Sequence, residues 1–284
     1  MGHIPPRDSM RRLILALTDG LRPDAITPTL MPSLHALAAA YTSAAAARTV
    51  RPSATVAALA SLATGVAPDT HRLIQPGLDF LPRIGRLRPV ARELGRHGVP
   101  ADVVTAELPI TSLPVAWALA AAAGVRRLLP AGRRARDTAA AADWLTGEDG
   151  SSLIFVYLPD CDRVGHEAGW MSDRYLAAAA ELDAGVGVLS KHVEDALLIV
   201  VADHGGGGVL ATEHHHPHPV NEHIPLVIAG PGVAREHRLE GPISILDLSA
   251  TVLWWFGAPI PDCYEGRPLL EAFAPELVPQ ETAS

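Results

Sequence analysis

The sequence has little cysteine, few aromatic residues (5%) and no long uninterrupted apolar run. Cys161 and Cys263 are too few for a disulfide framework and form no C-x-x-C pair, which indicates a reducing compartment. The longest apolar stretch, Leu113 to Val125, is shorter than the ~20 residues that cross a bilayer. The apolar run Leu13 to Leu17, which follows the N-terminal segment MGHIPPRDSMRR, is also too short for a signal-peptide core. We therefore expect a cytoplasmic protein that does not bind membranes.

An excess of positive charge is also missing. Lysine and arginine number 23 against 31 aspartates and glutamates, and the formal net charge is −8. The arginines between Arg126 and Arg136 form one local group, which is typical of a solvated helix face. This balance argues against binding of a nucleic-acid polymer. With 284 residues, 48% of them hydrophobic, the chain can bury a substantial globular core.

Three short apolar runs each end in acidic or imidazole side chains. LILALTD ends at Asp19, LIFVYLPDCD ends at Asp162, and LLIVVADH ends at Asp203 and His204. Runs of this length that are rich in Leu, Ile and Val are typical of buried parallel strands. The carboxyl ends of parallel strands meet at one edge of the sheet, where open α/β folds bind ligands. The sequence therefore predicts that these side chains gather at that edge.

Helix and strand signals alternate along the whole chain, which predicts βα units. We expect an α/β fold with a mostly parallel sheet sandwiched by helices, forming one domain over residues 1–284. A small cap or insert is expected within about residues 73–150, a stretch rich in Pro and Arg. The expected helices cover residues 31–47, 55–63, 90–97, 137–145, 172–193 and 245–256, and further strands cover 101–105, 197–201 and 224–229.

Several of these side chains suit a divalent metal. Asp162 and His166 lie four residues apart in an expected glycine-containing loop, and four glycines follow Asp203 and His204, so that the backbone can approach a bound group. Asp19 precedes Gly20, which taken alone is ordinary turn chemistry. A later loop adds imidazoles at His214, His215, His216 and His218. Carboxylates and imidazoles that converge from separate loops are the ligands of a divalent cation.

Thr55 begins an expected helix. Its hydroxyl could simply cap that helix. A helix N-terminus also presents free N–H groups and partial positive charge to phosphoryl or sulfuryl oxygens, and a metal would activate the hydroxyl as a nucleophile. Both interpretations remain open from the residues alone, and Ser53 is the alternative nucleophile.

The ordered series LILALTDGLRPD, ATVAALASLATGVAPDTH, PDCDRVGH, VVADHGGGG and IPLVIAGPGV resembles the alkaline phosphatase superfamily, in particular its type I phosphodiesterase/nucleotide pyrophosphatase branch. The resemblance runs from about residue 12 to the end and is least clear over residues 73–150. It implies an alkaline phosphatase-like fold and a centre of two divalent metal ions, Zn²⁺ before Mn²⁺ or Fe. One metal would be held by Asp19, Asp203, His204 and Thr55. The other would be held by Asp162, His166 and a histidine of the later loop, where we prefer His218 and keep His214 and His216 as alternatives.

The same resemblance implies hydrolysis of small-molecule phosphate esters, either diesters or monoesters, through a phosphothreonine at Thr55. One departure concerns Ala58, which stands where the diesterase branch has an asparagine that binds a phosphoryl oxygen. Arg22 and Arg51 lie near the ligand-bearing loops and could clamp a phosphate. A phosphonate hydrolase, a phosphoryl-transfer mutase or a non-catalytic metal- and phosphate-binding relative are the alternatives. A sulfatase is disfavoured because RPSATVAAL has no C-x-P-x-R or S-x-P-x-R sequence.

Overall fold

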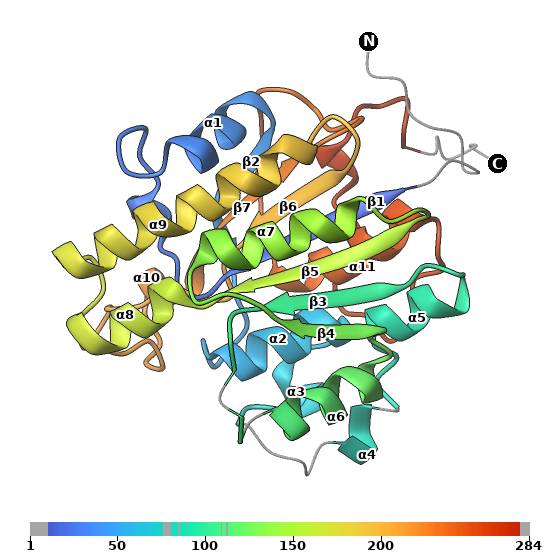
Figure 1. Ribbon diagram of the computed structural model, residues 1–284, viewed down its shortest axis with the longest axis horizontal. Helices are drawn as coiled ribbons and strands as arrows, with labels where there is room; N and C mark the ends of the chain where they lie inside the picture. The colour runs from blue at the N-terminus through green and yellow to red at the C-terminus, as the bar shows by residue number, and fades with distance from the viewer. Residues whose placement is uncertain (1–10, 76–80, 85, 109, 112, 279–284) are drawn as a thin grey trace.

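A computed structural model of the chain describes residues 11–75, 81–84, 86–108, 110–111 and 113–278. Its centre is an eight-stranded sheet in the order β4-β3-β5-β1-β6-β7-β2-β8 (Figure 1). The strands are β1 Arg12–Thr18, β2 Thr42–Arg48, β3 Ala101–Thr105, β4 Arg127–Pro130, β5 Ser152–Leu158, β6 Leu197–Val201, β7 His223–Ala229 and β8 His237–Arg238. Only β7 among them runs antiparallel to its neighbours. The expected mostly parallel α/β sheet is confirmed.

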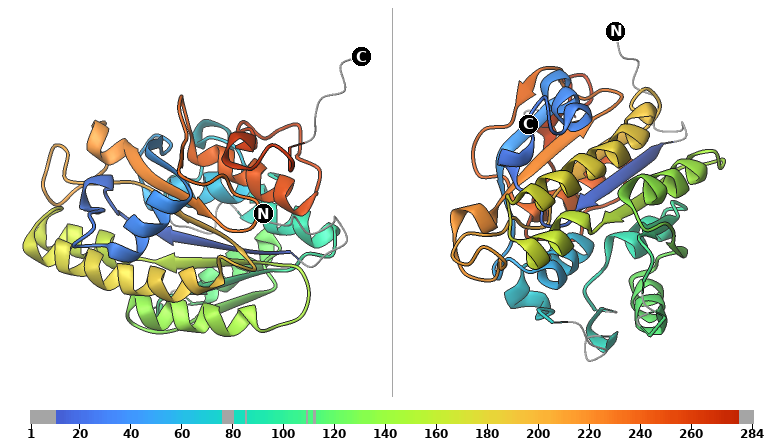
Figure 2. Two further views of the ribbon diagram at one scale, coloured as in Figure 1. Left: turned by 90° about the horizontal axis from the view of Figure 1, so that it is seen from above. Right: turned by 60° about the vertical axis from the view of Figure 1, so that its left-hand side comes forward.

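Helices cover both faces of this sheet (Figure 2). One layer contains α1, α7, α8 and α9, in which α7 packs along α9, and the other contains α2, α5 and α11 with the smaller α3, α4 and α6. The helices are α1 Pro32–Ala40, α2 Thr55–Thr64, α3 Pro68–His71, α4 Leu81–Ile84, α5 Val90–Arg96, α6 Leu113–Ala123, α7 Ala135–Thr146, α8 Asp160–Ala168, α9 Asp173–Leu189, α10 Pro219–Glu222 and α11 Ile245–Phe256, with short 3-10 helices at Pro23–Ala25, Ser190–His192 and Leu270–Ala272.

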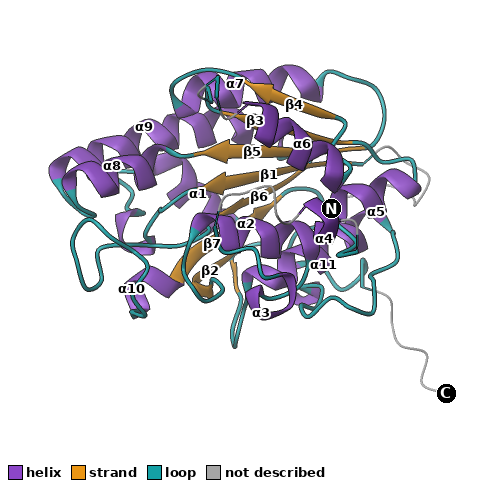
Figure 3. Ribbon diagram, turned by 90° about the horizontal axis from the view of Figure 1, so that it is seen from below, coloured by secondary structure: helices purple, strands orange, loops and turns teal. Residues whose placement is uncertain are grey.

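Strands β5, β1 and β6 are adjacent at the middle of the sheet, and they are the three apolar runs that end in candidate ligands. Leu15 of β1 lies between Phe155 of β5 and Ile199 of β6, so the three strands are in parallel register. Their carboxyl ends point to the same edge, where α8 and α10 also lie (Figure 3). The topology thus brings segments more than 100 residues apart to one place.

Part of the expected cap region belongs to the sheet. Within residues 73–150, β3 pairs with β5 and β4 pairs with β3, while α7 packs on α9 and β5. These elements extend the core because their apolar residues continue the parallel βα pattern. Helices α4, α5 and α6 are the described helices of this stretch that lie outside the α7 layer.

Two local predictions were wrong. The expected helix over 31–47 ends at Ala40, and residues 42–48 form the strand β2, which pairs with β7. The expected loop at Asp162 to His166 is the helix α8. None of the helices in the described part of the chain combines the length and the apolar character needed to span a bilayer.

Candidate active site

Three carboxylates converge at the ends of the central strands. Asp19 follows β1, Asp203 follows β6, and Asp162 lies in the first turn of α8, directly after β5. Backbone hydrogen bonds fix these segments to one another: the N–H of Asp162 donates to the carbonyl of Asp19 at 3.0 Å, and the N–H of Gly20 donates to Asp203 Oδ1 at 3.1 Å. The strand order therefore dictates that three negative side chains share one small volume.

His204 lies between these carboxylates. Its Nε2 is 3.3 Å from Asp19 Oδ1, 3.6 Å from Asp203 Oδ2 and 3.8 Å from Asp162 Oδ1. Its Nδ1 is 2.8 Å from the carbonyl of Gly205, which can only accept, so Nδ1 carries the hydrogen. The Nε2 atom of His204 is consequently the one directed at the carboxylates.

Two further histidines are held in the same way. The Nδ1 of His166 donates to the carbonyl of Thr212 at 2.8 Å, and the Nδ1 of His214 donates to the carbonyl of Ser53 at 2.6 Å. Their Nε2 atoms lie 3.1 Å apart, at 3.4 and 3.6 Å respectively from Asp162 Oδ1. Proteins usually fix the tautomer of a metal-binding histidine by a hydrogen bond from the ring nitrogen that does not bind the metal, often to a backbone carbonyl.

The structure brings His214, not the preferred His218, into this group. The ring of His214 stacks on His204 with 3.8 Å between centroids. The imidazole of His218 instead accepts a hydrogen bond from the backbone N–H of Val220 and caps α10. His216 lies 3.8 Å from Glu213 and is exposed. We therefore correct the choice of the last histidine to His214, one of the alternatives kept open above.

The electrostatics of the site call for a cation. Asp162 Oδ1 and Asp203 Oδ2 are buried without a hydrogen-bond partner among the described residues. Burial raises the pKa of Asp203 to about 7, and burial together with the charge of Asp203 raises the pKa of Asp19 well above its usual range. Burial and the neighbouring histidines lower the pKa of His214 to about 3, which keeps this imidazole neutral. Lone pairs that face one another in this way suit divalent cations.

Two sets of three ligand atoms have the spacing of a metal site. One consists of Asp19, Asp203 and His204, and the other of Asp162, His204 and His214. His204 can serve only one cation, and His166 lies within 3.4 Å of Asp162 to complete the second set. The donor chemistry therefore fits two cations held by Asp19, Asp203 and His204 and by Asp162, His166 and His214.

Thr55 lies beside these ligands at the first turn of α2. Its Oγ1 is 3.1 Å from His204 Nε2 and 3.5 Å from Asp19 Oδ1. The N-cap residue of α2 is Ala54, which makes no side-chain cap hydrogen bond, and the Thr55 hydroxyl is directed at the candidate ligands. The first N–H groups of α2 have no acceptor within the helix. They provide an anion-binding end next to the hydroxyl.

Other polar groups singled out from the sequence have different roles. The guanidinium of Arg51 forms two hydrogen bonds to Glu222, and Arg22 bonds to Asp24 and to the carbonyl of Gly206. Ser53 donates its hydroxyl to the carbonyl of His214 at 2.6 Å. Ser53 therefore fixes the histidine loop.

The sequence matches a model of the type I phosphodiesterase/nucleotide pyrophosphatase family over residues 13–247. The chain belongs to this family. The match confirms the resemblance inferred from the ordered motifs. A search of curated proteins finds no match.

Solved structures in the alkaline phosphatase superfamily share the fold of this family member. An inactive threonine-to-alanine variant of murine ectonucleotide pyrophosphatase/phosphodiesterase 5 in complex with AMP is 14% identical, with a TM-score of 0.71, covering 93% of this chain and 100% of that chain. A phosphonate monoester hydrolase from Silicibacter pomeroyi is 19% identical, with a TM-score of 0.65, covering 91% and 76%. A superfamily protein from Vibrio parahaemolyticus is 16% identical, with a TM-score of 0.70, covering 94% and 71%. At these identities the likeness shows the fold.

Tyr157 is a site residue of this phosphodiesterase-family chain that the sequence analysis missed. It lies on β5, and its hydroxyl donates a hydrogen bond to Asp19 Oδ2. Burial, followed by the charge of Asp19, raises the pKa of Tyr157 well above its usual range, so the hydroxyl stays protonated and donates. The one signal in the sequence was a tyrosine in an otherwise apolar buried strand, because a buried hydroxyl needs a partner.

Proposed function

We propose that this protein is a metal-dependent hydrolase of small phosphate esters, a phosphodiesterase or phosphomonoesterase, with Thr55 as its nucleophile. The observation that carries the proposal is the position of Thr55 Oγ1, 3.1 Å from the Nε2 of a histidine that faces two buried, unpartnered carboxylate oxygens. Family membership supports the reaction class. A small-molecule ester is the substrate class that this reaction implies.

Two divalent ions are the proposed cofactors, zinc first because mixed carboxylate and imidazole ligation suits it, with manganese or iron next. Asp19, Asp203, His204 and the Thr55 hydroxyl would hold one ion, and Asp162, His166 and His214 the other. Bound there, such a pair stabilises the attacking and leaving oxygens of an in-line displacement and lowers the pKa of water.

The residues of the chain supply the rest of the reaction. The Thr55 oxygen bonds to phosphorus, the bond from phosphorus to the leaving oxygen breaks, and the hydroxyl proton of Thr55 passes through water to the leaving oxygen, which departs as the alcohol. Water then hydrolyses the phosphothreonine and restores the Thr55 hydroxyl. The side chain of Ala58 offers no polar group to a phosphoryl oxygen. We assign that task to the uncapped N–H groups of the first turn of α2, which are directed at the same place as Thr55.

Two structural neighbours agree with this chemistry. The murine neighbour binds AMP in a form that a threonine-to-alanine change has inactivated, and the Silicibacter neighbour is a phosphonate monoester hydrolase. Both act at or bind a tetrahedral phosphorus group. These neighbours support the reaction class of the proposal and do not identify the leaving group.

The test compares wild type with Thr55→Ala and Ser53→Ala. Nitrophenol release is measured from a phosphate monoester, a phosphate diester and a phosphonate ester, with added Zn²⁺ and after chelation. We expect Thr55→Ala to lose turnover while it still binds zinc, because three strand-end ligands remain. Mass spectrometry of acid-quenched wild type should find the phosphoryl group on the peptide that contains Thr55. Full activity in Thr55→Ala, or activity that survives chelation, would overturn the proposal.

A further inference from the structure

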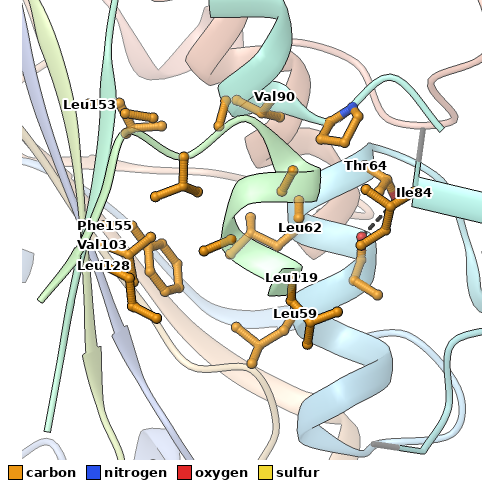
Figure 4. Close-up of a pocket in the computed structure, with 18 of the residues that line it drawn as sticks. Leu59, Leu62, Thr64, Ile84, Val90, Val103, Leu119, Leu128, Leu153 and Phe155 are labelled. Carbon is orange, nitrogen blue, oxygen red and sulfur yellow. Dashed lines mark hydrogen bonds between the residues drawn. The ribbon is translucent and has the colours of Figure 1, made fainter. Parts of the chain in front are cut away.

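A large apolar cavity lies beside α2, between this helix and the sheet. It has a volume of about 390 Å³, is partly open, and is lined by α2, α4, α5, α6 and α11 together with strands β1, β3, β4 and β5 (Figure 4). In Figure 4 the side chains of Val103, Leu128 and Phe155 point from the sheet towards Leu59 and Leu119 on the helices. The cavity is separate from the ligand cluster, although α2 contributes to both.

Apolar residues that a sandwiched sheet would normally bury remain partly exposed to this cavity. Val103 and Phe155 lie on β3 and β5, which have neighbours on both sides, yet neither is fully buried. On α2 the successive cavity-lining positions Val56, Leu59 and Ala60 are also only partly buried. Strands covered by helices on both faces are usually buried throughout. The cavity therefore replaces packing that the fold would otherwise supply.

Helix α6 also leaves apolar side chains only partly buried. Its eleven residues, LPVAWALAAAA, are all apolar, yet none of them is buried. Trp117 is 53% exposed. An occupant beneath α6 would bury apolar surface on its Val115, Ala116, Leu119 and Ala120 side, because these residues line the cavity.

The few polar groups in the wall are already satisfied. The Thr64 hydroxyl donates to the carbonyl of Ala60 at 2.6 Å, and the Ser249 hydroxyl donates to the carbonyl of Leu62 at 2.8 Å. Asp102 is paired with Arg126 and Arg127. A ligand with hydrogen-bonding groups would gain no partner here and would lose its hydration. The wall chemistry selects a hydrocarbon.

We propose that this cavity is a binding site for a hydrocarbon chain. An apolar cavity of about 150 Å³ stays dry and accepts benzene, so a cavity of more than twice that volume has room for a chain of about ten carbons. The cost of an empty cavity rises with its volume, which favours a filled state. The chain can come from a free lipid or from the alkyl group of a phosphate ester, and the two sources share this chemistry.

A second copy of the protein fits the cavity less well. The lining includes Phe155 and Leu153 of a central strand, which lie behind α2 and α6. A slender chain can reach between these helices, whereas a folded surface would have to displace them. Because Phe155 and Leu153 lie behind these helices, a small hydrocarbon ligand fits the cavity better than a second copy of the protein.

The test uses the fluorescent probe N-phenyl-1-naphthylamine and its displacement by 1-decanol on the full chain. Ala120→Phe places a ring in the cavity, whereas Ala121→Phe, on the same helix, adds the same ring at an exposed position outside the lining. We expect wild type and Ala121→Phe to bind the probe alike. Ala120→Phe should bind it at least about tenfold more weakly and should melt at a higher temperature than Ala121→Phe, because the ring fills empty space.

Several results would overturn the proposal. One is that wild type shows no saturable probe binding, and another is that Ala120→Phe and Ala121→Phe bind the probe equally. A third is that probe binding falls when a dimer of the protein is diluted to monomers. If Ala120→Phe fails to fold, Ala116→Phe makes the same comparison. Thr55→Ala should bind the probe as wild type does, so loss of ester hydrolysis and loss of hydrocarbon binding remain distinguishable. Inhibition of decyl but not methyl ester hydrolysis by 1-decanol identifies the ester as the source, and inhibition of neither identifies a free lipid.

Discussion

Replacing Tyr157 with phenylalanine removes one hydroxyl from the site and leaves the ring on β5 in place. That hydroxyl donates to Asp19 Oδ2, while Asp19 Oδ1 faces His204 and Thr55. The hydrogen bond opposes the effect of burial, which raises the pKa of Asp19. Without it, Asp19 loses both its orientation and part of the stabilisation of its charged form.

The size of the effect follows from the kind of hydrogen bond. A hydrogen bond to a charged group contributes about 1.5–3 kcal/mol, which corresponds to roughly 10- to 150-fold in an equilibrium constant. Loss of a partner that orients a metal ligand costs about 10- to 100-fold in metal affinity. We therefore expect the Tyr157→Phe protein to bind the zinc ion assigned to Asp19, Asp203 and His204 about 10- to 100-fold less tightly.

Competition with a chromogenic chelator measures this affinity. Tyr264→Phe is the matched control, because its hydroxyl donates to the carbonyl of Arg88 and not to a candidate ligand. Nitrophenyl ester hydrolysis at saturating zinc should recover most of the activity of Tyr157→Phe, since the nucleophile is intact. Zinc affinity of Tyr157→Phe equal to that of Tyr264→Phe would refute the assignment of Asp19 as a ligand oriented by Tyr157.

Three further changes test other parts of the structure. His214→Ala should lower zinc affinity and ester hydrolysis by about 100-fold or more, whereas His218→Ala should keep both within a few-fold, as chelator competition will determine. Glu93→Gln should lower the unfolding free energy at pH 7 by about 1–3 kcal/mol. Hydrogen bonds from its arginine partners lower the pKa of Glu93 below 4.5. The difference in unfolding free energy between wild type and Glu93→Gln, measured by urea melts, should therefore shrink as the pH falls through the folded pKa of Glu93. Gly205→Ala should destabilise the protein, because a Cβ there would lie 1.9 Å from the carbonyl oxygen of Val220. Gly95→Ala, in open space on α5, should instead raise the unfolding free energy by about 0.5–1 kcal/mol, and thermal melts of both variants measure the difference.

The central part of the site could be predicted because its determinants are local. Each of the three strands is an uninterrupted apolar run that ends at a polar residue, and parallel pairing then brings the ends together. The bounds of β6 and α11 agree with the expected 197–201 and 245–256. Helix α11 begins at the capping box of Ser244 and ends at Gly257 with φ of 71°. Strong start and stop signals made this helix predictable.

The wrong elements have determinants outside their own sequence. Residues 42–48 are mostly alanine, which favours helix locally, but the segment pairs with β7 and β8 and completes the edge of the sheet. The DCDRVGH segment contains a glycine and has a polar character that suggested a loop. In α8 that glycine, Gly165, packs against Trp170, and a Cβ would meet its ring at 2.6 Å. Strand pairing with β7 and β8 decides the first case, and in the second Gly165 leaves room for the Trp170 ring against the helix.

The choice between His214 and His218 was beyond sequence reasoning for a similar reason. Four histidines lie within five residues, and spacing along a loop does not determine the direction of a ring. The deciding contacts are the two hydrogen bonds that join His214 to Ser53, 161 residues earlier. Ser53 precedes the nucleophile helix by two residues, so the same short segment positions both Thr55 and the last histidine.

Helix α2 contributes to both sites and packs against α11, α3 and α5. Ser249 of α11 donates to the carbonyl of Leu62, and Ser61 hydrogen-bonds with His71 of α3. Val56 and Leu59 line the apolar cavity, and Leu62 and Ser249 line it as well. These polar contacts to α11 and α3 do not involve position 120, so we expect a ring placed there to leave the position of Thr55 relative to His204 unchanged. It follows that a ring placed in the cavity at position 120 should change hydrocarbon binding and leave the hydrolysis of short esters intact.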